Sequence, residues 1–267
     1  MRWLRDNLVL LLGLAVLAYT FVPIAVVILM SFNKPPGEQS KIYKFNSFTL
    51  DNWLHPCADP SMCTALKLSV EIGFFATLGA TILGTFAAFA LVRHDFHGRS
   101  ASNLLIFMPM AAPEIVLGSS LLALFVAAGL GGQLGFWTIL IAHIMFCLSF
   151  VVVTVRARLA GLDDNLEQAA MDLYATPTQT FWRVTFPLVF PGILGAALLS
   201  FSLSFDDFIV TNLNSGTTTT FPLYVWGVAQ RGVPMQVNVV GTVMFMIAIV
   251  IVVGGEVNSR RRSAKLA

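Results

Sequence analysis

Residues 163–191 read DDNLEQAAMDLYATPTQTFWRVTFPLVFP, a polar interruption between two long apolar runs. Asp163, Asp164 and Asn165 supply N-cap oxygens and negative charge at the start of a first helix. The apolar positions of this helix recur at helical spacing, at Leu166, Ala169, Ala170 and Leu173. The pattern predicts a short helix with one small, apolar face.

A second helix is predicted to begin after Thr176. Threonine is a preferred N-cap, Pro177 takes the first helical position, and Gln179 closes a capping box three residues after the cap. Pro177 also prevents the first helix from continuing. Pro187 and Pro191 are then expected to open a new hydrophobic span. The whole stretch therefore predicts a helix-bend-helix elbow at a membrane surface.

Two interpretations of this elbow, residues 163–186, follow from the pattern alone. Ala169 and Ala170 carry only methyl groups, so the first helix can sink into a groove of another protein and act as a docking element. The alternative is an interfacial amphipathic hairpin that lies on lipid headgroups. Both remain open at this point.

The elbow resembles the EAA signature of the permease subunits of binding-protein-dependent ABC importers. This resemblance implies a type I ABC importer (MetI-like) permease fold, in which the elbow is the cytoplasmic coupling helix that sits in a groove of an ATPase subunit. The residues that would carry this coupling are Leu166, Glu167, Gln168, Ala169, Ala170, Asp172, Leu173, Tyr174, Ala175, Phe181, Pro187 and Pro191. The implied partners are a second permease subunit in a heterodimer, two ATPase subunits and an external solute-binding protein.

Two positions depart from the family pattern. Gln168 stands where the family usually has Glu, and Tyr174 stands where it usually has Gly. A glycine at the bend would supply a positive φ, which costs a tyrosine roughly 1–2 kcal/mol. Either the bend stays right-handed here, or the Tyr174 ring is held against the partner.

The composition is that of an integral membrane protein. Hydrophobic residues make up 57% of the chain and charged residues 11%, whereas a soluble protein has roughly half apolar and a quarter charged residues. Several apolar runs exceed the roughly 20 residues that cross a bilayer as a helix. The sequence predicts an all-α polytopic fold that forms a single transmembrane domain over residues 1–267. Its six spans are expected at about 8–31, 67–92, 103–128, 135–156, 187–211 and 237–258.

Basic residues predict the orientation of these spans. The side that holds both termini and the elbow carries Arg2, Arg5, Arg93, Arg99, Arg156, Arg158, Arg183, Arg260, Arg261, Arg262 and Lys265. The opposite side carries Lys34, Lys41, Lys44, Lys67 and Arg231. The positive-inside rule therefore places the termini and the elbow in the cytoplasm. The resemblance to the binding-protein-dependent importers implies a prokaryotic plasma (inner) membrane. No small-residue cleavage site follows the first span, which is expected to be an uncleaved anchor.

The chain is not expected to be an enzyme. No GxxxxGK[ST] run occurs in it, so it has no phosphate-binding loop of its own and no bound cofactor is expected. The resemblance implies that ATP and Mg²⁺ are used by the partner ATPase. The net charge of +2 gives no indication of nucleic-acid binding.

The outward segment after the first span contains Cys57, Cys63 and Trp53. A non-cytoplasmic compartment permits a disulfide between the two cysteines. These cysteines and His55 are too irregularly spaced to predict a metal site. Phe-Thr-Leu-x-x-Trp, which ends at Trp53, resembles the short interfacial helix before the second span of this permease family. Trp53 and Trp226 would contact an amine by cation-π interaction or anchor the chain at the membrane interface.

Three carboxylates lie within or beside predicted spans: Glu114, Asp206 and Asp207. A carboxylate in the hydrocarbon costs roughly 2.5–3.5 kcal/mol on insertion scales, so each should face protein or water. Pro109 and Pro113 can interrupt the third span just before Glu114. Adjacent helical residues point about 100° apart, so one aspartate is expected to face a pathway while the other caps, pairs or reaches the interface. The alternative is a polar helix end with a structural hydrogen bond.

Two buried polar candidates are expected to serve packing. His143 is predicted to be a hydrogen-bonded packing residue, and Cys147 a small hydrophobe inside the fourth span. Two stripes of small residues predict close helix contacts: Ala76, Ala80, Gly84 and Ala88 in one span, and Gly192, Ala196, Ser200 and Ser204 in another.

Within the ABC permeases, the chain resembles the spermidine/putrescine permease subunits of the C type. The segments that carry this resemblance are 112–116, 133–137, 146–148, 150–155 and 204–207, together with His143. The resemblance implies ATP-driven polyamine import by alternating access. A chain of ammonium groups needs carboxylates spaced along its path, which Glu114, Asp206 and Asp207 would supply. The alternatives are a permease for another small cationic or organic solute, or an ion-coupled secondary transporter.

Overall fold

The computed structural model describes residues 7–34, 44–163 and 165–266. Arg2, Arg5, Lys41 and Asp164 lie outside these ranges. For residue 256 and residues 258–266, which include Arg260, Arg261, Arg262 and Lys265, only the helical backbone is described. Within the described part, all regular secondary-structure elements are helices. The only β-type pairing among these residues is an isolated bridge between Asn33 and Phe48. The predicted all-α fold is confirmed.

The described residues form two compact units, 1–63 with 225–267 and 64–224. The boundaries fall inside α4 (Pro60–Arg93) and α12 (Phe221–Ala229). The interpretation of the whole chain as a single domain stays a prediction, as does the placing of both termini in the cytoplasm.

The first unit is built on two long apolar helices, α2 (Leu8–Ser31) and α13 (Met235–Leu266). The C-terminal half of α2 contacts the N-terminal half of α13, for example through the rings of Phe21 and Phe245, whose centroids are 6.3 Å apart. The short helix α3 (Asp51–Leu54) is held at the end of α2, because the Asn52 side-chain amide donates to the Ser31 carbonyl. The predicted short helix before the second span is therefore present.

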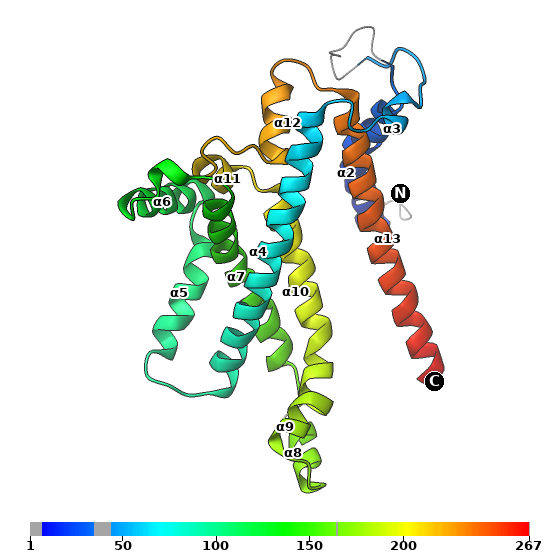
Figure 1. Cartoon of the computed structure of the whole chain (residues 1–267). Helices are drawn as coiled ribbons and strands as arrows, with labels where there is room; N and C mark the ends of the chain where they lie inside the picture. The colour runs from blue at the N-terminus through cyan, green and yellow to red at the C-terminus, as the bar shows by residue number, and fades with distance from the viewer. Residues whose placement is uncertain (1–6, 35–43, 164, 267) are drawn as a thin grey trace. The chain divides into compact units, whose positions relative to one another are not determined.

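The second unit is a bundle around α7 (Phe136–Ala160), which is buried along most of its length (Figure 1). The other elements of this unit, besides most of α4 and the start of α12, are α5 (Arg99–Ala111), α6 (Glu114–Ala127), η1 (Gly131–Gln133), α8 (Asn165–Asp172), α9 (Pro177–Thr180), η2 (Phe181–Thr185), α10 (Phe186–Asp206) and α11 (Ile209–Asn214). Helices α5, α10 and α11 pack directly on α7. The elbow and the connection between α4 and α5 lie at one end of this bundle (Figure 1).

Small residues bring the helices of this bundle close together. Ala80 and Ala88 of α4 are fully buried in the core. A methyl group on Gly84 would lie 2.7 Å from a side-chain carbon of Val151 on α7, too close to be accepted without movement. Ala196 and Ser200 of α10 are likewise fully buried. Both predicted small-residue stripes thus lie at packed surfaces.

Among the described residues, five helices are long and apolar enough to cross a membrane, or six if the bent pair of α5 and α6 is counted as one span. The third predicted span is not a straight helix. In place of one helix over 103–128, the chain forms α5 and α6, which are bent by 111° relative to each other. Pro113 is the N-cap of α6, and the residue before it, Ala112, is extended with ψ 139°. Because a residue before proline is driven out of the helical region, the break occurs here.

The fifth span also differs from the prediction. A new helix does not begin at Pro187; instead the helix runs without a break from Pro177 to Asp206. The missing N–H of Pro187 is accommodated by the π-helical turn η2, in which the N–H of Phe186 donates to the carbonyl of Phe181 five residues back. The helix then ends at Asp206 rather than at residue 211, because the next residue, Asp207, is extended with ψ 124°. Helix α11 follows as a separate element.

Candidate functional site

The bend of the elbow is a helix C-terminal motif in which a tyrosine takes the place of glycine. After α8, the N–H of Ala175 donates to the Ala170 carbonyl (3.1 Å) and the N–H of Tyr174 donates to the Met171 carbonyl (2.9 Å). This pair of bonds defines a Schellman motif, whose αL residue is usually glycine. Tyr174 has φ 64°, the only positive φ of a non-glycine residue in the described part of the chain. The bend is therefore left-handed.

The second helix of the elbow begins with the predicted capping box. The backbone N–H of Gln179 donates to Thr176 Oγ1 (3.3 Å), and the backbone N–H of Thr176 donates to Gln179 Oε1 (3.0 Å). Pro177 occupies the first turn. These contacts involve only residues three positions apart, so the local sequence is sufficient to produce them.

One side chain ties α8 to the membrane helices. Glu167 Oε1 accepts from Arg93 Nη2 at 2.6 Å and from Thr185 Oγ1 at 2.7 Å. Arg93 is the last residue of α4, and Thr185 belongs to the π-helical turn that leads into α10. Both partners of the ion pair are about a quarter exposed. A displacement of α8 would therefore pull directly on the end of α4 and on the turn η2 that leads into α10.

The opposite side of the elbow is open to its surroundings. Leu173 is 82% exposed and Tyr174 is 96% exposed. Leu166, Gln168, Ala169 and Asp172 are exposed as well, while Ala170 and Ala175 are half-buried. The ring of Phe181 turns inward and lies 5.6 Å from that of Phe89 on α4. An exposed surface is thus formed by six of the predicted coupling residues: Leu166, Gln168, Ala169, Asp172, Leu173 and Tyr174. Glu167 instead bonds to α4 and η2, and Pro187 and Pro191 lie within α10.

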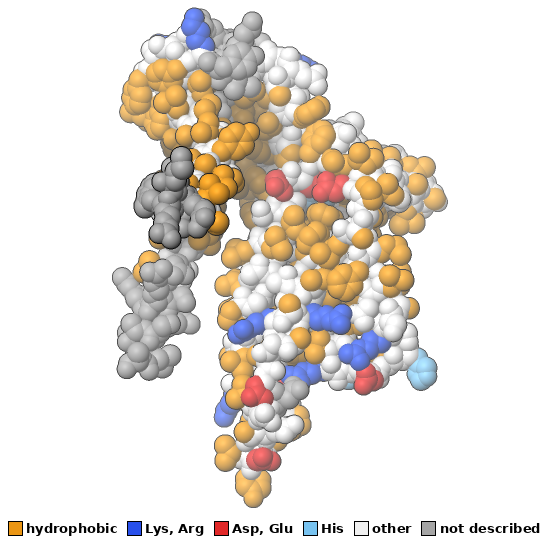
Figure 2. Space-filling view, turned by 180° about the vertical axis from the view of Figure 1, so that it is seen from behind, with side chains coloured by type: hydrophobic (Ala, Val, Ile, Leu, Met, Phe, Trp, Pro, Cys, Tyr) orange, Lys and Arg blue, Asp and Glu red, His pale blue; other side chains and the backbone are white. Residues whose placement is uncertain are grey.

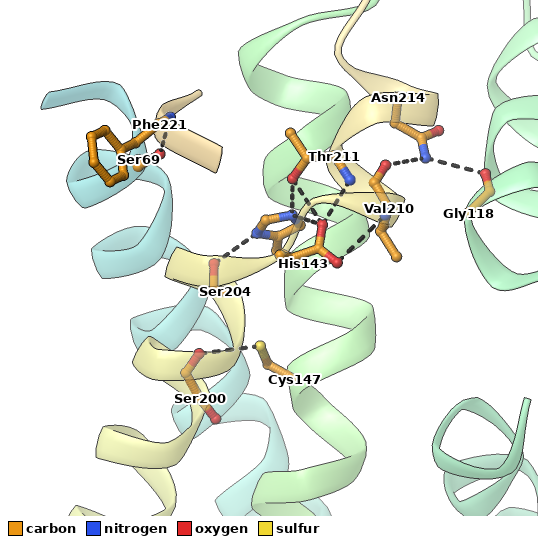
Figure 3. A network of polar contacts seen from close by, with 11 residues as sticks. Ser69, Gly118, His143, Cys147, Ser200, Ser204, Val210, Thr211, Asn214 and Phe221 are labelled. Atoms are coloured by element: carbon orange, nitrogen blue, oxygen red, sulfur yellow. Dashed lines mark hydrogen bonds and ion pairs between the residues drawn. The ribbon is translucent and has the colours of Figure 1, made fainter. Parts of the chain in front are cut away.

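A second polar cluster lies in the bundle where α7, α10 and α11 meet (Figure 3). His143 is buried; its Nδ1 lies 2.7 Å from Ser204 Oγ and its Nε2 lies 2.9 Å from Thr211 Oγ1. Asp207 is also buried and accepts from the backbone N–H of Thr211 at 2.7 Å and from its hydroxyl at 2.9 Å. Asp207 Oδ2 lies 3.3 Å from His143 Nε2. The predicted hydrogen-bonded role of His143 is confirmed.

The three candidate carboxylates occupy different environments. Asp207 caps α11 from inside the bundle, whereas Asp206, the last residue of α10, is exposed. Glu114 is exposed in the first turn of α6. One turn further along α6, the Gly118 carbonyl accepts from the Asn214 side chain of α11 at 3.1 Å. Glu114 therefore begins α6, and Asp206 lies shortly before α11, the two helices that this hydrogen bond joins.

Figure 2 shows two acidic patches among hydrophobic side chains toward the end of the second unit away from the elbow, and a band of Lys and Arg between them and the elbow, with further acidic side chains beside this band and on the elbow.

Comparison with known proteins identifies the family. The model of the inner membrane component of binding-protein-dependent transport systems matches residues 80–257, more than half of the chain. The chain belongs to this family. It is a multi-pass inner-membrane permease of the ABC importer type, as the EAA resemblance implied.

Relatives and solved structures agree with this family. The permease is 35% identical over 249 residues to the spermidine/putrescine transport system permease protein PotC of Haemophilus influenzae, covering 93% of this chain and 95% of the relative. It is 35% identical to the putrescine transport system permease protein PotI of Escherichia coli, covering 88% and 84%. A bacterial ABC transporter involved in alginate import matches with a TM-score of 0.63 at 18% identity, over 97% of this chain and 96% of that one. An amino acid ABC transporter matches with a TM-score of 0.59 at 14% identity, over 80% and 100%. These structures support the fold.

The two aromatic candidates of the permease lie in its first unit. Trp53 stacks on Phe32, with ring centroids 5.4 Å apart, and its indole N–H donates to Ser31 Oγ at 3.2 Å. These contacts hold α3 to the end of α2. Trp226 is 58% exposed on α12. A disulfide joins Cys57 and Cys63, whose Cα atoms are 5.6 Å apart, and Cys147 is buried. Among the described residues, no group of His, Cys, Asp or Glu could hold a metal ion.

Sequence reasoning missed two charged residues of the permease. Arg93 was recognised only as a topological signal, yet it holds the elbow through Glu167. Glu71 lies within α4, and its carboxylate is 3.7 Å from the Lys67 ammonium. The rule that an acid inside a span needs a partner or a polar surrounding, applied to Glu114, would have identified Glu71 as well.

Proposed function

We propose that this chain is a permease subunit of an ATP-driven polyamine importer. In this proposal it forms a heterodimer with a second permease subunit, receives substrate from an external solute-binding protein, and is driven by two ATPase subunits that use ATP and Mg²⁺. The named functions of the PotC and PotI relatives support the polyamine substrate. The proposed mechanism is alternating access between an inward-open and an outward-open state. The binding of ATP and the binding of substrate are coupled in it if both favour the same global state.

The observation that carries the proposal is the two-sided construction of the elbow. Its outer side exposes Ala169, Leu173 and Tyr174, while its inner side is bonded to α4 and η2 through Glu167. An ATPase that holds the outer side would move the cytoplasmic ends of α4 and α10 through these bonds. A hairpin that only rested on lipid headgroups would not need this ionic attachment to two membrane helices.

The exposed acids supply the substrate chemistry of the proposal. Glu114 and Asp206 would contact successive ammonium groups of a polyamine, while Asp207 keeps the helix break that places Asp206 at the end of α10. In the first unit, taken by itself, Trp226 would offer an aromatic face to a cation, and Trp53 would support the outward segment.

The coupling step is tested by Ala169→Trp. The bulky ring should prevent ATPase association and abolish uptake while membrane insertion stays normal. Ala101→Trp is the matched control, because Ala101 is also an exposed alanine, at the cytoplasmic start of α5. Normal uptake by the Ala169→Trp variant, in a reconstituted complex, would contradict the docking surface.

The substrate is tested separately by uptake of labelled spermidine in the same complex, with putrescine and other organic cations as competitors. Glu114→Gln and Asp206→Asn should each lower uptake at least tenfold without loss of the assembled complex. Unchanged uptake in both variants would remove the acids from the pathway. Uptake driven by an ion gradient in the absence of the ATPase would favour the secondary transporter instead.

A further inference from the structure

The chain between α10 and α11 bears on the direction of an exposed acid. Residues 207 and 208 separate the two helices, and we call them the α10–α11 break. Asp207 is extended, with φ −63° and ψ 124°, so the chain leaves the helical path directly after Asp206. No further turn of α10 follows to hold Asp206 in place. The direction of its carboxylate therefore depends on how the last turn of α10 is held.

Ser204 holds this last turn from its buried side. It lies two residues before Asp206, and two residues of a helix are about 200° apart around the axis. Ser204 is accordingly buried, whereas Asp206 is exposed. The hydroxyl oxygen of Ser204 lies 2.7 Å from Nδ1 of His143 on α7. This contact restricts rotation of the last turn, and with it the direction of Asp206.

The same imidazole also holds the start of α11. Its Nε2 lies 2.9 Å from Thr211 Oγ1 (Figure 3) and 3.3 Å from Asp207 Oδ2. The bonds between Asp207 and Thr211 cap α11 but do not attach it to the bundle, because the two residues are only four positions apart and move together. His143 belongs to α7, the buried helix at the centre of the bundle. One side chain thus connects both sides of the α10–α11 break to a third helix.

The hydrogen-bond pattern uses both nitrogens of the ring. Thr211 Oγ1 donates its own hydrogen to Asp207 Oδ2, so it can accept one from Nε2 of His143. In the neutral ring, Nδ1 then accepts from the hydroxyl of Ser204. All four side chains are buried, and buried polar groups need partners within the protein. An apolar side chain of similar size would fill the space but would supply neither bond.

The far end of α11 is held without His143. Thr138 of α7 donates from Oγ1 to the Asn214 carbonyl at 2.7 Å, and the Asn214 side chain donates to the Gly118 carbonyl of α6 at 3.1 Å. Loss of the imidazole should therefore loosen the α10–α11 break while α11 stays attached to the bundle. The role of His143 can thus be tested in a folded protein.

We propose that His143 is a positioning residue for substrate passage. It holds the α10–α11 break through Ser204 on one side and Thr211 on the other, and so keeps the Asp206 carboxylate where an ammonium group of the substrate meets it. The buried ring acts through Asp206 and does not contact the substrate itself. This inference rests on the proposed function, which assigns Asp206 its substrate contact.

A double-mutant cycle in the reconstituted complex tests this role. Uptake of labelled spermidine, delivered by the solute-binding protein, is measured for His143→Leu, for Asp206→Asn and for the double variant. We expect His143→Leu to lower uptake at least fivefold, while ATP hydrolysis by the partner subunits changes less than twofold. Because His143 acts through Asp206, uptake by the double variant should lie within twofold of that by Asp206→Asn alone. If the two effects multiply instead, His143 is a packing residue only and the inference is wrong.

Further variants separate positioning from a general loss of packing. His143→Gln brings an amide N–H toward the place of Nε2 and keeps the bond to Thr211, so its uptake should exceed that of His143→Leu at least threefold. Thr138→Val is the matched control, because it removes another buried hydrogen bond between α7 and α11, away from the α10–α11 break. It should lower thermal stability but keep uptake within twofold. Equal uptake by His143→Gln and His143→Leu, or an equal loss in Thr138→Val, would overturn the inference.

Two other results have a defined meaning. If His143→Leu does not assemble, Ser204→Ala takes its place in the cycle, because it removes only the bond to α10, and the same non-additive result is expected. Lower uptake in Asp206→Asn with multiplied effects in the double variant rejects the role of His143 and leaves the polyamine proposal intact. Unchanged uptake in Asp206→Asn removes the acid itself from the pathway, and the inference is rejected with it.

Discussion

Replacing Tyr174 by glycine should stabilise the elbow, although it removes a large side chain. Tyr174 has φ 64°, and a non-glycine residue in this region is strained by roughly 1–2 kcal/mol. Its ring is 96% exposed, so its removal sacrifices almost no packing within the chain. The greater freedom of glycine in the unfolded state offsets about 0.5–1 kcal/mol of the gain. The expected net stabilisation of the bend is therefore about 0.5–1 kcal/mol.

Hydrogen-deuterium exchange of the isolated permease in nanodiscs measures this effect. The N–H groups of residues 174 and 175 close the Schellman motif, so their exchange reports its opening directly. A stabilisation of this size should slow their exchange about two- to fivefold in Tyr174→Gly. Tyr174→Ala is the control, because it removes the ring but keeps a β-carbon and hence the strain. Faster exchange in Tyr174→Gly than in the natural chain would refute the strain argument.

The same variants separate strain from docking. If the tyrosine ring is retained because it contacts the ATPase, both Tyr174→Gly and Tyr174→Ala should weaken ATPase association, and Tyr174→Phe should preserve it. Strained backbone conformations cluster at functional sites, so a tyrosine at a position where glycine would have a lower conformational energy indicates such a contact. Unchanged association in all three variants would assign the tyrosine no part in docking.

Two further substitutions test the interior of the bundle. Gly84→Ala should lower the stability of the permease by about 1–3 kcal/mol, since its methyl group would lie 2.7 Å from Val151. Gly195→Ala, with nothing within 4 Å, should instead raise stability by up to about 1 kcal/mol in the same thermal unfolding assay, because alanine loses less backbone freedom on folding. Asp207→Asn should cost about 1–3 kcal/mol by weakening the buried cap of α11, whereas Asp206→Asn should leave thermal stability unchanged. Equal effects within either pair would contradict the packing or the capping described here.

The local parts of the fold were predictable from sequence. The capping box at Thr176 and Gln179 depends on residues three positions apart, and the first span was predicted at about 8–31 and found at Leu8–Ser31. Prolines were harder to interpret. Pro113 lies at a sharp bend between two helices. Pro187 lies in a continuous helix, in which the preceding π-helical turn accommodates its missing N–H. Which outcome occurs depends on neighbouring elements, and the sequence around a proline does not specify those.

The polar contacts of the candidate site were not predictable, because they join residues far apart in sequence. Arg93 and Glu167 are 74 residues apart, and His143 and Ser204 are 61 apart. The sequence indicated that one of the two adjacent aspartates would cap or pair. Only the arrangement of α7 and α11 shows that this residue is Asp207.

The acidic side chains of the bundle fall into two groups, according to whether other residues of the chain bond to their carboxylates. Asp207 and Glu167 are bonded to neighbouring helices, and their charges hold the structure together. Asp206 and Glu114 have no ion-pair partner among the described residues, although both end helices that form part of the bundle. A carboxylate at membrane depth needs water, a cation or a polar neighbour. Asp206 and Glu114 are therefore two acids whose charge stays available for the cationic substrate proposed above, whereas Asp207 and Glu167 are engaged in holding helices together.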